Sequence, residues 1–153
     1  MRDKDLLLGI DIGTTGTKCS VYDFRGIRVA SAYREYPMIH PRPGWTEQDP
    51  YRWWDTVCCN LQTIFKSQNI DKNRIAAVGT SSTNAVVLVD RQGQPVCNAI
   101  SLHDQRSGHQ VEWLKENIGE ERIRGVAANR IANGSFCLPA LRWLVENQVD
   151  LIK

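Results

Sequence analysis

The sequence predicts an α/β protein built around a mixed β-sheet. The order of elements is the first reason, because three strand-like segments precede a helical one, which further short strands and then helices follow. The second reason is residues 6–12, a nearly continuous apolar run typical of a strand covered on both faces. The chain has 153 residues, 42% of them hydrophobic and 24% charged, which is enough for a domain with its own core.

The first three predicted strands are neighbours along the chain. Residues 17–24 and 27–36 follow residues 6–12, and both are rich in residues that favour strands. Arg25 and Gly26 form the turn between the second and third strands. Because these connections are short, we expect an antiparallel meander.

A helix is predicted after a proline-containing loop that ends near Gln48. Asp49 is placed to cap it, and Pro50 suits the first helical position. Apolar residues then recur at helical spacing, which predicts one buried face: Trp54, Val57, Cys58, Leu61, Ile64 and Phe65. The helix is expected to end within residues 69–73.

The remaining elements are shorter. Strands are predicted at residues 75–79, 85–90 and 99–102, and helices at residues 107–117 and 138–148. Residues 122–132 fit neither pattern. The helical pattern continues almost to Lys153 without a capping signal, so we expect the chain to be a truncated N-terminal domain, residues 1–153, with a second domain absent.

Composition excludes several classes of function. The 19 basic and 17 acidic residues are well mixed, so no basic stripe indicates nucleic-acid binding. No apolar run is long enough to cross a membrane, and the N-terminus does not resemble a secretory signal, which favours a cytoplasmic protein. The five cysteines lack the spacing of a metal site and are expected to be buried reduced thiols.

The segment most suggestive of chemistry is the turn after residues 6–12. Asp11 follows an apolar strand, where its carboxylate could hold Mg²⁺. Gly13 and Gly16 allow a tight turn close to an anion, hydroxyl donors lie between and beside them, and Lys18 adds a positive charge. An ordinary hairpin with a polar tip fits the same pattern, so both interpretations stay open.

The segment GIDIGTTGTK resembles the first phosphate-binding segment of the sugar kinase, Hsp70 and actin superfamily. Within it the chain is most similar to the FGGY carbohydrate kinases. Residues 43–50, with Trp53 and Trp54, resemble the family segment GW.EQDP..WW, and Asp104-Gln105-Arg106 resembles its D.R element. Residues 77–95 resemble the family's next strand pair, and residues 136–143 resemble its helix start F..PKL.W.

The resemblance implies an actin-like, ribonuclease H-like fold and a role for each site residue. Asp11 would be the metal-binding acid, and the phosphate would contact the turn residues Gly13, Thr14, Thr15 and Lys18. The sugar or polyol would contact Ser82, Thr83, Asn84 and Asp104. Arg106 would brace the loop that carries Asp104. ATP and Mg²⁺ are the implied cofactors, and the full-length enzyme could form a homodimer.

The sequence departs from the family where substrate would bind. Leu102 stands where family members often carry Trp, and His103 stands where Asn or Gln is usual. Thr83-Asn84 matches neither the Met-His of xylulokinases nor the Arg-Glu of glycerol kinases. The resemblance therefore implies a xylulokinase-like sugar or polyol kinase without fixing the sugar.

The resemblance also implies that no catalytic base lies in this chain, because the family's Asp base falls beyond Lys153. We expect an N-terminal portion of an ATP-dependent carbohydrate kinase that is inactive in isolation. The alternative is a non-catalytic sugar- or partner-binding remnant of the same fold. An actin- or Hsp70-like ATPase ranks lower, since it would not need Asp104-Gln105-Arg106 or residues 44–50.

Overall fold

The computed structural model describes residues 4–134 and 136–151, which divide into two compact units. The first unit comprises the described residues of Met1–Pro37 and Tyr51–Thr83. The second comprises those of Met38–Pro50 and Asn84–Lys153. Each unit contains a β-sheet and a cluster of buried hydrophobic side chains.

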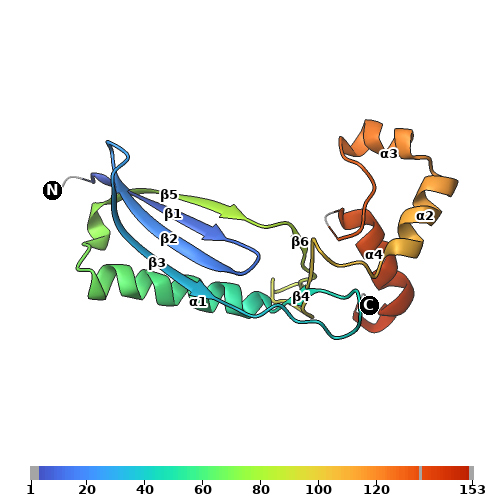
Figure 1. Cartoon of the computed structure of the whole chain (residues 1–153), viewed down its shortest axis with the longest axis horizontal. Coiled ribbons are helices and arrows are strands. Elements are labelled where there is room, and N and C mark those ends of the chain that lie inside the picture. The colour runs from blue at the N-terminus through green and yellow to red at the C-terminus, as the bar shows by residue number, and fades with distance from the viewer. Residues whose placement is uncertain (1–3, 135, 152–153) are drawn as a thin grey trace. The chain divides into compact units, whose positions relative to one another are not determined.

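The first unit is organised around a sheet with the strand order β3-β2-β1-β5. Its strands are β1 (Leu6–Ile12), β2 (Gly16–Asp23), β3 (Arg28–Glu35) and β5 (Ile75–Ser82). The first three pair antiparallel, and β5 runs parallel to β1 along its other side (Figure 1). The predicted antiparallel meander and mixed sheet are confirmed.

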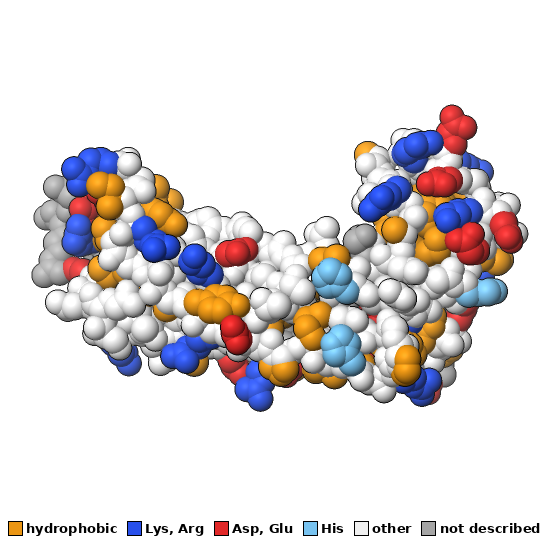
Figure 2. Space-filling model, in the orientation of Figure 1, with side chains coloured by type: hydrophobic (Ala, Val, Ile, Leu, Met, Phe, Trp, Pro, Cys, Tyr) orange, Lys and Arg blue, Asp and Glu red, His pale blue; other side chains and the backbone are white. Residues whose placement is uncertain are grey.

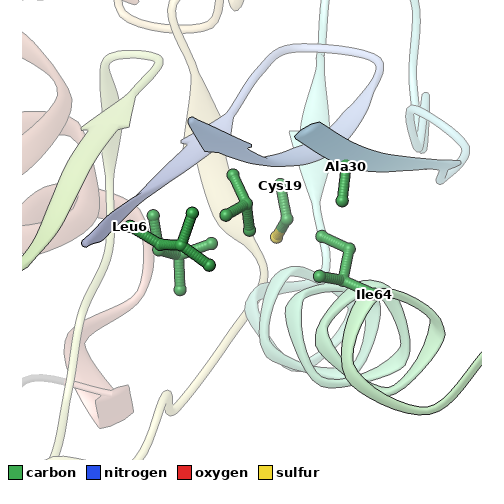
Figure 3. Close-up of a cluster of buried hydrophobic side chains, with 6 residues drawn as sticks. Leu6, Cys19, Ala30 and Ile64 are labelled. Atoms are coloured by element: carbon green, nitrogen blue, oxygen red, sulfur yellow. The ribbon is translucent and has the colours of Figure 1, made fainter. Parts of the chain in front are cut away.

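One face of this sheet is covered by α1 (Pro50–Gln62) and the π-helical turn η1 (Thr63–Ser67). Figure 3 shows Leu6, Cys19 and Ala30 extending from the strands toward Ile64 on the helix, in one buried cluster. Because side chains alternate between faces along a strand, these core positions direct Asp11 to the opposite face.

Buried polar side chains fix α1 to the start of β2. The Thr56 hydroxyl donates to Thr17 Oγ1 at 2.9 Å, and Asn60 Nδ2 donates to the Thr17 carbonyl at 2.8 Å. Thr17 and Asn60 are fully buried. A buried polar group without a partner is costly, so these bonds select the face that α1 turns toward the sheet.

The hydrogen bonds of Thr56 and Asn60 explain why one prediction about α1 is wrong. Trp54 was expected on the buried face, but it is 68% exposed. The buried face is rotated toward Thr56, Val57 and Asn60 instead. Helical spacing alone could not identify Thr56 and Asn60 as inward-facing, because both are polar.

The second unit contains a small sheet with the order β4-β7-β6. The strands are β4 (Glu47–Gln48), β6 (Ala85–Val86) and β7 (Ala99–Ser101), and the helices are α2 (Gly108–Asn117), α3 (Glu120–Ala127) and α4 (Cys137–Asn147). The 3₁₀ turns are η2 (Lys72–Arg74), in the first unit, and η3 (Val149–Leu151), in the second. Helix α3 lies partly in the segment that the sequence pattern left unassigned. The strand predicted at residues 85–90 is shorter than expected: β6 ends at Val86, and Val89 forms only an isolated bridge with Pro95.

The surface bears both signs of charge. On the face shown in Figure 2, Lys and Arg side chains are interspersed with Asp and Glu side chains, in line with the mixed charge of the sequence. Among the described residues, no helix has both the length and the apolar character needed to cross a membrane.

Burial distinguishes Cys19 from the other cysteines. All five are free thiols, but Cys19 is fully buried while Cys59 and Cys137 are exposed, so the expectation of buried thiols holds for only part of the set. Burial raises the pKa of Cys19 from its ordinary value of 9.0 to about 11, although a hydrogen bond with Asn60 opposes the shift.

We predict that alkali destabilises the first unit through Cys19. The folded state keeps its full stability below pH 9. It loses stability as the pH rises from 9 toward 11, because in that range the Cys19 thiol ionises only in the unfolded chain. Urea titrations at pH 8 and pH 10.5 should show the free energy of unfolding fall by up to about 2 kcal/mol more in the wild type than in Cys19→Ala. Equal losses in both proteins would contradict the prediction.

Candidate functional site

The turn between β1 and β2 carries most of the predicted phosphate-binding residues. The register of the two strands pairs Asp11 with Lys18, so their exposed side chains lie beside each other on the face opposite α1. The Gly13 N–H donates to the Gly16 carbonyl at 2.9 Å and closes the turn. Thr14 and Thr15 therefore lie at its tip, between the acid and the lysine in sequence.

The parallel strand β5 brings a second set of polar groups to this turn. Its register places Ser81 beside Asp11, and the Ser81 hydroxyl donates to Asp11 Oδ1 at 2.7 Å. The Thr83 N–H donates to the Ile12 carbonyl at 2.8 Å, and the Thr83 and Thr14 hydroxyl oxygens lie 3.3 Å apart. A residue predicted to contact phosphate thus lies against one predicted to contact substrate, although 69 positions separate them.

A pocket of about 360 Å³ opens beside the Asp11 and Lys18 side chains. It is lined by Gly9, Ile10, Asp11, Lys18, Ser20, Tyr22, Gly79, Thr80 and Ser81. Gly9 and Gly79 are register partners, and the absence of side chains there helps to hollow the sheet surface. The Ser20 hydroxyl in its wall is buried without a hydrogen-bond partner among the described residues.

Asp11 fits Mg²⁺ as one ligand among several. Its side chain is exposed, and no described residue hydrogen-bonds its second oxygen, Oδ2. Among the described residues, no group of three or more His, Cys, Asp or Glu side chains could hold a metal ion. Mg²⁺ commonly binds through one or two carboxylates, substrate phosphates and water, which is the kind of site that Asp11 could supply.

The turn depends on a close approach at Gly16. A Cβ atom there would lie 2.5 Å from the Arg34 carbonyl oxygen and 2.6 Å from the Tyr33 hydroxyl oxygen. The first of these atoms belongs to the backbone of β3 and cannot move without disturbing the sheet. Glycine is therefore required by packing at this position.

The remaining predicted substrate residues lie near the end of β5 and in the second unit. Ser82 is the exposed last residue of β5, and Asn84 is exposed in the second unit. Asp104, also in the second unit, is only 1% exposed. Its carboxylate accepts hydrogen bonds from the Thr46 N–H at 2.6 Å and from the Arg106 N–H at 2.9 Å.

Arg106 connects Asp104 to the core of the second unit. Its guanidinium pairs with Asp104 Oδ2 at 2.9 Å and with Glu47 Oε1 at 2.7 Å, and its side chain is 4% exposed. It also lies over the Trp45 ring, 3.9 Å from the ring centroid, while Trp143 meets Trp45 edge-on. These contacts support the predicted bracing role of Arg106, and they join three segments distant in sequence.

Sequence reasoning did not identify several residues that shape these sites. Ser81 was missed although it precedes Ser82, because strand register decides which hydroxyl faces Asp11. Tyr36 was predicted only as a strand end, yet its side chain reaches the β1–β2 turn. Glu47 was noted only within a family motif, and no local pattern signals its pairing with Arg106.

We predict that Gly16→Ala destabilises the chain by about 1–3 kcal/mol, because the new methyl group collides with the β3 backbone. The matched control is Gly79→Ala, since a Cβ at Gly79 meets no atom within 4 Å. This control should unfold within about 0.5 kcal/mol of the wild type or be slightly more stable. Urea denaturation followed by circular dichroism measures both, and equal midpoints for the two variants would refute the packing explanation.

We predict a larger cost for Asp104→Asn, about 3 kcal/mol, because it leaves the buried Arg106 guanidinium without one of its anionic partners. The matched control is Glu112→Gln, which removes an exposed partner of Lys115 and should cost less than about 0.5 kcal/mol. Chemical denaturation monitored by tryptophan fluorescence compares them. A loss for Asp104→Asn as small as that for the control would show that the buried network contributes little.

Comparison with known proteins adds a family to this geometry. Residues 6–153 match the model described as FGGY family of carbohydrate kinases, N-terminal domain. The chain is 32% identical over 143 residues to glycerol kinase of Paraburkholderia phytofirmans, covering 92% of this chain and 28% of that protein. It is 34% identical over 146 residues to glycerol kinase of Haloferax volcanii, and the match covers 94% of this chain and 28% of that protein.

Solved structures agree with this relationship. The xylulose kinase of Rhodospirillum rubrum superposes with a TM-score of 0.88 at 26% identity, covering 95% of this chain and 30% of that one. The gluconate kinase of Lactobacillus acidophilus superposes with a TM-score of 0.86 at 26% identity, covering 95% of this chain and 29% of that one. The chain spans less than a third of the length of these relatives. The chain therefore belongs to the FGGY family of carbohydrate kinases, and it corresponds to the family's N-terminal domain.

Proposed function

We propose that this chain is the N-terminal portion of an ATP-dependent kinase that transfers the γ-phosphate of ATP to a hydroxyl of a sugar or polyol. The observation that carries the proposal is the meeting of Thr14 with Thr83 and of Asp11 with Ser81. Phosphate transfer requires a phosphate site and an acceptor site side by side. Family membership supplies the reaction class, and relatives named as glycerol, xylulose and gluconate kinases indicate the range of acceptors.

Each residue of the turn has a proposed part in this reaction. The Thr14 and Thr15 hydroxyls and the Lys18 ammonium group bind phosphate oxygens, and the Gly13–Gly16 turn lets the backbone approach them. Mg²⁺ bound with ATP would neutralise charge on the phosphates, and Asp11 is the residue that would hold it. Preorganised positive groups of this kind stabilise the charge that develops during transfer.

The acceptor is proposed to contact Ser82, Thr83 and Asn84. Asp104 was predicted to hydrogen-bond a sugar hydroxyl, and that stays a prediction. The N–H groups of Thr46 and Arg106 already engage its carboxylate, which favours a role in holding the loop around His103 over direct contact. For the complete enzyme we also propose a cytoplasmic location and a catalytic base that lies outside this chain.

We predict that the isolated chain binds Mg-ATP weakly through the turn but does not turn it over. Titration followed by ¹⁵N–¹H NMR should shift the amide signals of residues 13–18, with a dissociation constant in the millimolar range because the chain corresponds only to the family's N-terminal domain. Asp11→Asn should raise the dissociation constant about tenfold, since it removes the proposed metal ligand. The matched control, Asp90→Asn, alters an acid in an exposed turn of the second unit and should bind like the wild type.

A coupled assay with glycerol, xylulose or gluconate as acceptor should detect no ADP formation by the chain alone. Turnover would show that the base lies within these residues and would overturn the proposed division of the site. Sugar-dependent shifts without any ATP-dependent shift would instead favour a non-catalytic sugar-binding remnant.

A further inference from the structure

Tyr36 follows the last residue of β3 and is buried where its neighbours are not. It is 7% exposed, whereas Glu35 and Pro37 on either side are exposed. The residue before a proline is restricted to extended conformations, so Pro37 limits the directions that the Tyr36 side chain can take. A buried phenol hydroxyl needs a hydrogen-bond partner, and that of Tyr36 has one in the β1–β2 turn.

Both hydrogen-bond donors of Tyr36 bind the β1–β2 turn. Its hydroxyl donates to the Gly13 carbonyl at 2.5 Å, and its backbone N–H donates to the Thr15 carbonyl at 3.2 Å. The acceptors of these two hydrogen bonds are the carbonyls of the residues on either side of Thr14. Tyr36 is thus attached to the tip of the turn at two points, in addition to the ladder that joins β2 to β3.

These bonds matter for an anion because carbonyl oxygens carry partial negative charge. A turn binds phosphate when it presents N–H and hydroxyl groups and keeps its carbonyls turned away. The Gly13 and Thr15 carbonyls are held by Tyr36 and are therefore not free to rotate toward a phosphate. Glycine at position 13 makes such rotation easy, so a restraint from outside the turn is needed.

The Tyr36 hydroxyl is suited to a permanent donor role. Burial raises the pKa of Tyr36 above its ordinary value of 10.0, and the charge of Asp11 adds to the rise, although a hydrogen bond with Thr17 opposes it. The phenol therefore stays protonated at neutral pH. Its donor function does not depend on pH in the physiological range.

We infer that Tyr36 is a positioning residue of the phosphate turn, holding the Gly13 and Thr15 carbonyls away from the nucleotide so that the Thr14 and Thr15 hydroxyls face it. The inference rests on the proposed function. It adds a residue from outside the turn, contributed by the segment after β3. Tyr36 does not touch the phosphate itself.

The test compares Tyr36→Phe, which removes the hydroxyl and keeps the ring, with Tyr33→Phe. Tyr33 is the matched control, because its hydroxyl lies 3.4 Å from Thr15 Oγ1 but binds no turn carbonyl, and its side chain is exposed. Amide hydrogen exchange without nucleotide reads the order of the turn. We expect the Gly13 N–H to exchange about tenfold faster in Tyr36→Phe, with Leu8 in β1 unchanged, and no change at either site in Tyr33→Phe.

The second readout is the dissociation constant for Mg-ATP, measured by NMR titration. We expect it to rise about fivefold to tenfold in Tyr36→Phe. Tyr33→Phe serves as the control for hydrogen exchange only, because its hydroxyl lies 3.4 Å from Thr15 Oγ1, a proposed phosphate contact. If the wild-type chain binds no Mg-ATP, the proposed function fails, and the exchange experiment still tests the restraint. Unchanged exchange at Gly13 in Tyr36→Phe overturns the inference even if Mg-ATP binding persists.

A measurement on the wild type guards against misfolding of the variant. The Tyr36 hydroxyl proton should be protected from exchange with solvent in NMR spectra of tyrosine-labelled chain, as expected for a buried donor. A hydroxyl that exchanges as fast as that of Tyr33 would show that the bond to Gly13 does not persist in solution, and would overturn the inference without any mutation.

Discussion

The parallel pairing of β1 with β5 brings the proposed phosphate-binding and acceptor-binding residues together. Two parallel strands end at the same edge of a sheet, so the residues that follow each strand must meet there. The register sets Asp11 beside Ser81, and the residues beyond place Thr14 beside Thr83. A shift of one residue in this register would turn Ser81 to the face that α1 covers and separate the acid from its hydroxyl partner. The hydrophobic cluster around Cys19 and Ile64 determines which face of β1 lies against α1, and Ile75 at the start of β5 packs against the same cluster.

The two compact units use different interactions to hold their polar residues. In the first, backbone bonds and small residues shape the turn, with Gly16 allowing the close approach of β3 and Tyr36 restraining the carbonyls. In the second, the buried guanidinium of Arg106 gathers Asp104 and Glu47 and stacks on an aromatic ring. The first arrangement leaves Asp11 and Lys18 exposed to ligands, whereas the second uses up the hydrogen-bonding capacity of Asp104. Because of this contrast, we propose that the β1–β2 turn binds phosphate and that the Arg106 network mainly supports the loop that carries Asp104.

Local patterns in the sequence predicted the parts of the fold that depend on neighbouring residues. The apolar run of residues 6–12, the glycine turn and the Arg25–Gly26 turn were sufficient to predict the antiparallel meander. Family motifs predicted Asp11 and Thr83 as site residues, and that stays a prediction. Features that depend on partners distant in the chain were not predictable in this way. The prediction that Trp54 lies on the buried face of α1 is wrong, because the sequence does not indicate that the polar residues Thr56 and Asn60 bind Thr17. The role of Tyr36 and the burial of Asp104 likewise depend on contacts that no spacing rule encodes.

The most direct test of the central claim is a crystal structure of the chain with Mg²⁺ and a non-hydrolysable ATP analogue. The strand register predicts phosphate oxygens within hydrogen-bonding distance of Thr14, Thr15 and Lys18, and the metal ion beside Asp11. Phosphates bound elsewhere on the first unit, for instance in the pocket beside Phe65 and Lys66 of η1, would contradict the assignment of this edge of the sheet as the phosphate site.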